Sequence, residues 1–230
     1  LAPLLVAFLL VELRRERPAV DPRLLAQRPF AAAVLGVFGA TIVLHGTFLV
    51  VPMLVEIVLE QSPATSGSVL LGVAAVSALV APFGGRLSDR RGRRALAVAG
   101  GLVMALGVAG LATPVGAGSV VLIALLLGVV GLGFGLAGSP RQAAAFESIE
   151  RSRLGMAAGT YYTGRYLGGV VGASVAGAIV GSTVTAEGVE LTFAVLAVAA
   201  VGVAIASLGL RAAPAGGRPA AAGGHAPTAA

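Results

Sequence analysis

The 230-residue sequence contains no cysteine, no lysine and no tryptophan, and only 11% of its residues are charged. The absence of cysteine excludes disulfides and thiolate metal sites. The low charge accompanies 57% hydrophobic residues, whereas an ordinary soluble domain has roughly 45–50% apolar and about 25% charged residues. This composition excludes a water-soluble domain and predicts a protein that lies in a lipid bilayer.

The net charge of +6 comes from 16 arginines against 10 acidic residues. Nucleic-acid binding would require a basic face interleaved with stacking aromatics, but these arginines lie in short stretches between apolar ones, so we expect no nucleic-acid partner. No Walker-type phosphate loop is present, and His45 and His225 are the only histidines. We therefore expect neither an enzyme nor a bound metal or cofactor.

Six apolar stretches are long enough to cross a bilayer, which takes about 20 residues of helix. The predicted fold class is all-α, a polytopic transmembrane bundle over residues 30–210. Its six full spans are placed at 30–57, 66–83, 95–113, 118–138, 155–181 and 190–210.

The segments on either side of the bundle have other compositions. Residues 1–11 are apolar but too short to span, and no basic stretch precedes them as in a signal peptide, so we interpret them as the tail of a truncated transmembrane helix. Residues 12–29 are charged and contain three prolines, which predicts a cytoplasmic linker with a short interfacial helix at most. Residues 211–230 are mainly Ala, Gly and Pro, which predicts a disordered cytoplasmic tail.

The arginines are confined to alternate connections between the spans. They precede the first span, fill the connections after the second and fourth, and follow the sixth, while the other connections have none. Because basic loops stay cytoplasmic, this pattern predicts a cytoplasmic C-terminus. Arg165 is the exception, since it lies inside the fifth span.

The connection after the second span is more elaborate than a topological signal requires. It sets two glycines and one aspartate among five arginines. Asp89 can pair locally or accept from a helix N-terminus, Gly85 permits close helix approach, and Gly92 permits a left-handed turn. A carboxylate latched to a neighbouring helix end would hold the cytoplasmic side closed. The residues of this motif are Gly85, Leu87, Asp89, Arg90, Gly92, Arg93 and Arg94.

The motif resembles the G-x-L-x-D-R-x-G-R-R signature of the major facilitator superfamily. Other stretches are similar to the 14-helix drug:proton antiporter branch of that family: residues 12–18 look like its linker, 51–67 like the end of its next helix, and 165–172 like its penultimate helix. The N-terminal half of such proteins has an Arg in its fourth helix and a Gly-Pro motif in its fifth. The predicted spans here have neither, which favours the C-terminal half.

The resemblance implies proton-coupled efflux of drug-like small molecules by alternating access, in the inner membrane of a bacterium. It implies a gating role for the motif, a proton gradient as the driving force, and three partners: the bilayer, a small-molecule substrate and the missing N-terminal helix bundle. Two alternatives stay open. One is an uptake facilitator or symporter for a small metabolite, and the other is a non-transporting membrane scaffold or remnant.

Ionisable groups inside spans are functional candidates. Arg165 either lines the cavity and pairs with an anionic group, or snorkels towards the surface. Glu56, where the family usually has Gln, either exchanges protons or lies among outer headgroups. His45, about three turns before it on a similar face, either titrates or packs. Tyr162 and Tyr166, which with Tyr161 and Phe134 are the candidate aromatic groups, either line the cavity for drug-like molecules or only pack.

Small residues in the fifth span recur one turn apart, which lets two helix backbones approach closely in a membrane. They can serve as packing seams or as surfaces that slide during a change of shape. The glycines concerned are Gly164, Gly168, Gly169 and Gly172.

Overall fold

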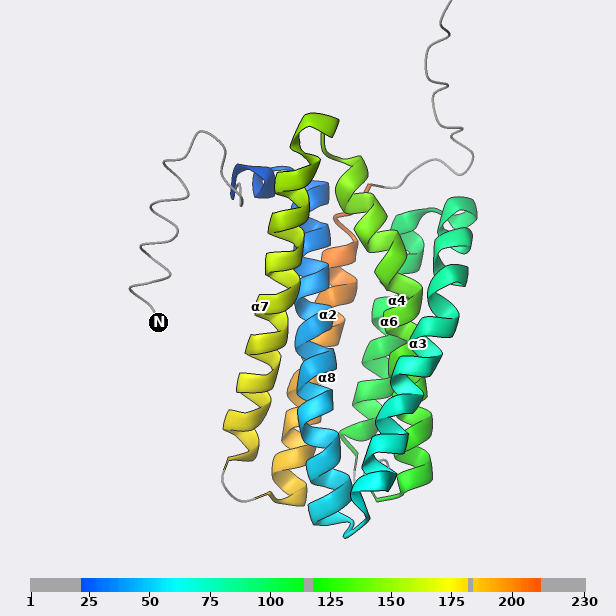
Figure 1. Cartoon of the computed structure of the whole chain (residues 1–230), viewed down its shortest axis with the longest axis vertical. Helices are drawn as coiled ribbons and strands as arrows, with labels where there is room; N and C mark the ends of the chain where they lie inside the picture. The colour runs from blue at the N-terminus through cyan, green and yellow to red at the C-terminus, as the bar shows by residue number, and fades with distance from the viewer. Residues whose placement is uncertain (1–21, 114–117, 182–183, 212–230) are drawn as a thin grey trace, which may run out of the picture.

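The computed structural model describes residues 22–113, 118–181 and 184–211, and these residues form an all-helical bundle (Figure 1). The predicted truncated helix at 1–11, most of the linker and nearly all of the tail lie outside the described residues. The part of the linker that is described contains a short 3-10 helix, Pro22–Ala26, before the first long helix begins at Arg28.

Six α-helices make up the described bundle, in agreement with the predicted fold class. They are α2 (Arg28–Met53), α3 (Pro63–Arg91), α4 (Arg93–Leu111), α6 (Val120–Glu147), α7 (Leu154–Val180) and α8 (Ala186–Ser207). A π-helical turn, Leu54–Val58, extends α2. Five of the six have the length and apolarity to cross a membrane. α7 has the length as well, but it lies outside this set, since its sequence contains three tyrosines, seven glycines and Arg165.

Several helices run beyond the predicted spans. α3 continues to Arg91 rather than residue 83, and α6 to Glu147 rather than 138, while α2 begins at Arg28 and α8 at Ala186. Apolarity marks only the part of a helix that lies in hydrocarbon, and arginine, glutamine and glutamate are good helix formers beyond it. Hydropathy therefore located the helices correctly but placed several helix ends inside the observed ones.

α2 packs along α7, and α6 packs along both α3 and α4. α8 packs against both α2 and α4 and so joins these two sets of helices, with a smaller contact between α2 and α6. α3 is the least covered, since only 17% of its most apolar window is buried. The buried core is mostly aliphatic, with Phe193 and Met104 among its larger side chains, and glycines of α4, α6 and α7 are buried as well. Small buried residues suit helices that associate by close packing in lipid.

Successive helices run in opposite directions, so the arginine-bearing ends of the described helices lie at the same end of the bundle (Figure 1). We call this the arginine-rich end. It holds the start of α2, the α3–α4 junction, the α6–α7 connection with its short 3-10 helix Arg151–Arg153, and Arg211 after α8. The opposite end holds the turns after the π-helical segment and after α7.

Candidate functional site

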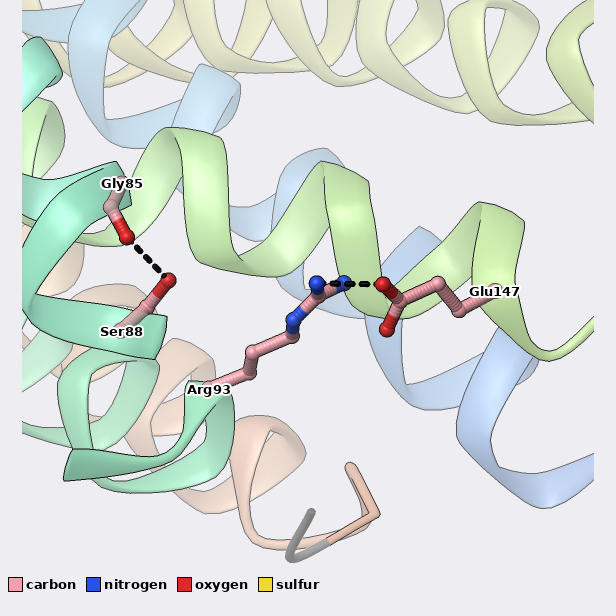
Figure 2. Close-up of polar contacts among 4 residues, drawn as sticks. All are labelled: Gly85, Ser88, Arg93 and Glu147. Carbon is pink, nitrogen blue, oxygen red and sulfur yellow. Dashed lines mark hydrogen bonds and ion pairs between the residues drawn. The ribbon is translucent and has the colours of Figure 1, made fainter. Parts of the chain in front are cut away.

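The motif predicted as a loop is mostly helical. α3 carries it to Arg91, Gly92 alone separates the two helices, and α4 begins at Arg93. Gly92 has a φ of 87°, which a residue with a side chain rarely adopts. A single glycine therefore reverses the chain between two membrane helices. Within the last turns of α3, the Ser88 hydroxyl donates to the Gly85 carbonyl at 2.7 Å (Figure 2).

The close helix approach at this junction belongs to Gly84 rather than Gly85. A Cβ at Gly84 would lie 2.7 Å from the Leu136 carbonyl oxygen of α6, whereas one at Gly85 would lie 4.0 Å from the Ser139 Cβ. The prediction for Gly85 was wrong by one residue, because successive residues of a helix point about 100° apart and sequence does not show which one faces α6.

The charges of the motif are largely exposed. Arg86, Asp89, Arg90, Arg91 and Arg94 are all exposed, and Leu87 is half-buried. An open groove of about 520 Å³ lies over this end of α3. Its lining residues are Phe83, Arg86, Leu87, Asp89 and Arg90. The motif thus presents charge and apolar surface together at the end of the bundle.

The ion pair at this end joins Arg93 to Glu147, the last residue of α6 (Figure 2). Sequence analysis did not single out Glu147, and nothing in its surroundings marked it. Asp89 makes no ion pair with any residue that the structure describes. The local pairing considered for Asp89 is therefore not seen, and its carboxylate stays available to a partner outside the described residues.

His45 and Glu56 share one stripe of α2 that is not buried. Its residues, three or four apart, are Leu35, Phe38, Ile42, His45, Leu49, Pro52 and Glu56. His45 is exposed, and its Nδ1 lies 3.1 Å from the Thr41 carbonyl oxygen. Glu56 lies in the π-helical turn and accepts a hydrogen bond from the Ser66 hydroxyl of α3. Single π turns often occur at functional sites.

Arg165 lies at the α2–α7 contact through its backbone, while its side chain is exposed. The Thr41 hydroxyl of α2 donates to the Arg165 carbonyl oxygen at 2.8 Å. Glu56 lies fifteen residues beyond Thr41, or about 22 Å along the helix. The structure therefore does not bring Arg165 and Glu56 together.

The tyrosines of α7 lie on the same helix as Arg165. Tyr162 is 36% exposed, and its hydroxyl accepts from the Gln142 amide of α6 at 3.3 Å. Tyr166 is 72% exposed. Tyr161 is buried and stacks edge-on against Tyr162, with 5.7 Å between ring centroids. Tyr162 thus links α7 to α6, and Tyr166 is open to a partner or a ligand.

The glycines singled out in α7 all lie against α2. A Cβ at Gly168 would overlap the Phe38 carbonyl, and one at Gly172 would overlap the Ile42 carbonyl. A Cβ at Gly164 would lie 3.0 Å from Val34, and one at Gly169 would lie 3.1 Å from the His45 ring. These glycines form the α2–α7 seam and set the position of His45.

Arg141 is a functional candidate that was not predicted, because it follows the apolar stretch 118–138 and was therefore expected in a connection. The structure places it inside α6, where it is only 2% exposed. Its neighbour Pro140 is also buried. The sequence places Pro140 before Arg141, but a proline in that position does not predict burial of the next residue.

Comparison with known proteins identifies the family. The sequence model of the Major Facilitator Superfamily matches residues 2–230. An uncharacterized MFS-type transporter of Bacillus subtilis, YwoD, is 28% identical over 85% of this chain and 44% of its own length. In Mycobacterium tuberculosis, the multidrug resistance protein B homolog is 27% identical over 70% of this chain and 30% of its own length.

A second Mycobacterium tuberculosis relative, the multidrug resistance protein Stp, is 27% identical over 78% of this chain and 33% of its own length. The chain therefore spans less than half the length of these curated relatives. A family match along nearly the whole chain agrees with the membrane-length helices and with the glycine and arginine motif at the α3–α4 junction. This chain is a multi-pass membrane protein that belongs to the major facilitator superfamily.

Proposed function

We propose that the chain is the C-terminal half of a proton-coupled efflux transporter for drug-like small molecules. Membership of the superfamily points to transport rather than catalysis. Two of the relatives described above are named multidrug resistance proteins, which supports a substrate of this class. The 14-helix branch is the assignment that the linker and α7 motifs favour.

The exposed charge of the gate motif is the observation that carries this proposal. Asp89 and its neighbouring arginines surround an open groove, and Asp89 has no ion partner among the described residues. In a half-transporter these groups bind the N-terminal bundle and hold the arginine-rich end closed. A non-transporting scaffold would not require a glycine turn, a groove and one carboxylate in the same place.

The proposed orientation places the arginine-rich end and the C-terminus in the cytoplasm of a bacterium, since basic connections stay inside. The substrate cavity then forms at the midplane between the two bundles and changes its access by rocking. His45 and Glu56 lie on the unburied stripe of α2 and are the candidates for proton exchange within this chain. Further carboxylates for coupling are expected in the N-terminal bundle.

The test uses the full-length transporter in a drug-sensitive bacterial strain loaded with ethidium. We expect efflux that stops when a protonophore collapses the proton gradient. Efflux that persists without the gradient would contradict proton coupling, and net ethidium accumulation driven by the gradient would favour the uptake alternative. Absence of any gradient-dependent movement over a panel of drugs and metabolites, with the protein present in the membrane, would favour the scaffold.

A further inference from the structure

Arg141 is a guanidinium sealed inside the bundle. It lies six residues before the end of α6, about 9 Å along the helix, and is 2% exposed. Its Nε atom is buried and has no hydrogen-bond partner among the described residues. Gly36 of α2 makes room for it, since a Cβ there would lie 2.8 Å from that Nε. The arginine thus occupies a space that α2 leaves open.

Polar side chains of α6 and α7 lie in the neighbourhood of Arg141. Tyr161 of α7 is buried, and both Arg141 and Arg165 lie near enough for their charges to act on its hydroxyl. Gln142, the next residue of α6, bonds the exposed Tyr162. We call these five residues, Arg141, Gln142, Tyr161, Tyr162 and Arg165, the Arg141 cluster.

The Arg141 cluster contains two positive charges and no acid. The described acids at the arginine-rich end are Asp89, Glu147 and Glu150, and none of them forms an ion pair with Arg141 or Arg165. Glu147 is bound by Arg93 instead. The positive charge of this cluster is therefore uncompensated within the described part of the chain.

An uncompensated guanidinium in this position is costly. Burying a charge without a partner costs several kcal/mol, and arginine cannot escape the cost by losing its proton. A planar oxyanion removes that cost, because the guanidinium fork matches a carboxylate with two parallel hydrogen bonds. The tyrosine hydroxyls and the Gln142 amide beside it can donate further hydrogen bonds.

We propose that the Arg141 cluster binds a carboxylate in the working transporter. The carboxylate comes either from the transported substrate or from a side chain elsewhere in the full-length protein. The first source rests on the proposed transport function and adds molecules that carry a carboxylate to the drug-like substrates, whereas the second does not depend on what is transported. Binding requires α2 and α6 to separate slightly at Gly36, so that the ligand reaches the buried nitrogens.

Dye binding to the purified full-length protein in lipid nanodiscs tests the substrate source without requiring transport. Rhodamine B carries a free carboxylate, and rhodamine 6G has a similar dye core with that group esterified. Fluorescence polarisation measures the binding of each dye. We expect Arg141→Gln to weaken rhodamine B binding about tenfold or more, because it removes at least one charged hydrogen bond. The same variant should weaken rhodamine 6G binding less than about twofold. Arg141→Lys should restore only part of the rhodamine B affinity, because lysine keeps the charge but lacks the two parallel N–H donors of the guanidinium.

Two further variants control for folding and for general charge. Arg151→Gln removes an exposed arginine at the same end and should change neither dye. Gly36→Ala keeps the charge but places a methyl group against Nε, so it should weaken rhodamine B binding by an intermediate factor even if Arg141→Gln does not fold. Size-exclusion chromatography verifies that each variant is intact.

Carbodiimide labelling with mass spectrometry tests the protein source. If a side chain supplies the carboxylate, Arg141→Gln exposes it, and one acid of the full-length protein becomes newly reactive while Arg151→Gln changes nothing. The proposal is overturned if Arg141→Gln or Gly36→Ala, verified as folded, alters neither the dye selectivity nor the labelling of any acid. Either positive result stands even if the protein moves no drug, so failure of the efflux proposal would be recognised separately.

Discussion

The α3–α4 junction and the α6–α7 region handle charge in opposite ways at the same end of the bundle. At the junction, Asp89 and most of the arginines are exposed around a groove. Next to the other connection, Arg141 of α6 is buried against Gly36 of α2. Exposed charges can make and break contacts at low cost, whereas a buried charge needs a counter-charge. The first region therefore suits a gate and the second a binding site.

The largest effect is expected at the gate. Asp89→Asn keeps the shape of the side chain but removes the charge that we propose to latch the N-terminal bundle. Losing one charged hydrogen bond costs about 1.5–3 kcal/mol, so ethidium efflux by the full-length protein should fall about tenfold or more, with membrane insertion unchanged by immunoblot. Glu150→Gln, which removes another exposed acid at this end, is the control. Equal efflux by Asp89→Asn and the parent protein would contradict the latch.

The next effect distinguishes Gly84 from Gly85. A methyl group at Gly84 would meet the backbone of α6, which cannot give way as a flexible side chain can, so Gly84→Ala should destabilise the protein by about 1–3 kcal/mol. Gly85→Ala meets only ordinary contact and should not destabilise it. Thermal unfolding of the purified protein measures both. A lower midpoint for Gly85→Ala than for Gly84→Ala would mean that α3 is rotated relative to the described packing.

These two glycines also show what sequence can and cannot predict. Apolar runs predicted the six helices. The arginines in alternate connections predicted which helix ends lie together at the arginine-rich end, as Figure 1 shows. The rotation of α3 against α6 could not be predicted, since it depends on which side chains interdigitate. The burial of Arg141 was equally invisible, because hydropathy treats an arginine beyond an apolar run as a loop residue, and the space for it comes from Gly36, more than a hundred positions away in sequence.

A smaller effect is expected at the turn itself. Gly92 has a positive φ, and an alanine there adopts that conformation only with strain. Gly92→Ala should lower the unfolding free energy by about 1 kcal/mol or somewhat more. Denaturant or thermal unfolding, compared with Gly128→Ala in an open part of α6, measures it. Equal stability of the two variants would show that the junction relaxes without a left-handed residue.

The smallest effect is expected at the Arg93–Glu147 pair. The Arg93 side chain is 17% exposed and the Glu147 side chain 59%. Because water reaches the carboxylate, we expect the pair to contribute between about 0 and 1 kcal/mol, as exposed ion pairs do. Glu147→Gln should therefore shift the thermal midpoint by no more than a few degrees, and raising the salt concentration should reduce even that difference. A large loss of stability in this variant would contradict this prediction. It would mean that the ion pair, and not only the packing of the helices, holds α4 and α6 together.

Transport by the chain alone compared with the full-length protein tests the central claim most directly. Both proteins are reconstituted into liposomes with a pH gradient, and movement of ethidium is followed by fluorescence. We predict gradient-driven transport by the full-length protein and none by residues 1–230 alone, because the proposed half-transporter needs an N-terminal bundle to complete its cavity and to bind the motif at the α3–α4 junction. Ethidium transport by the isolated chain would contradict the half-transporter account.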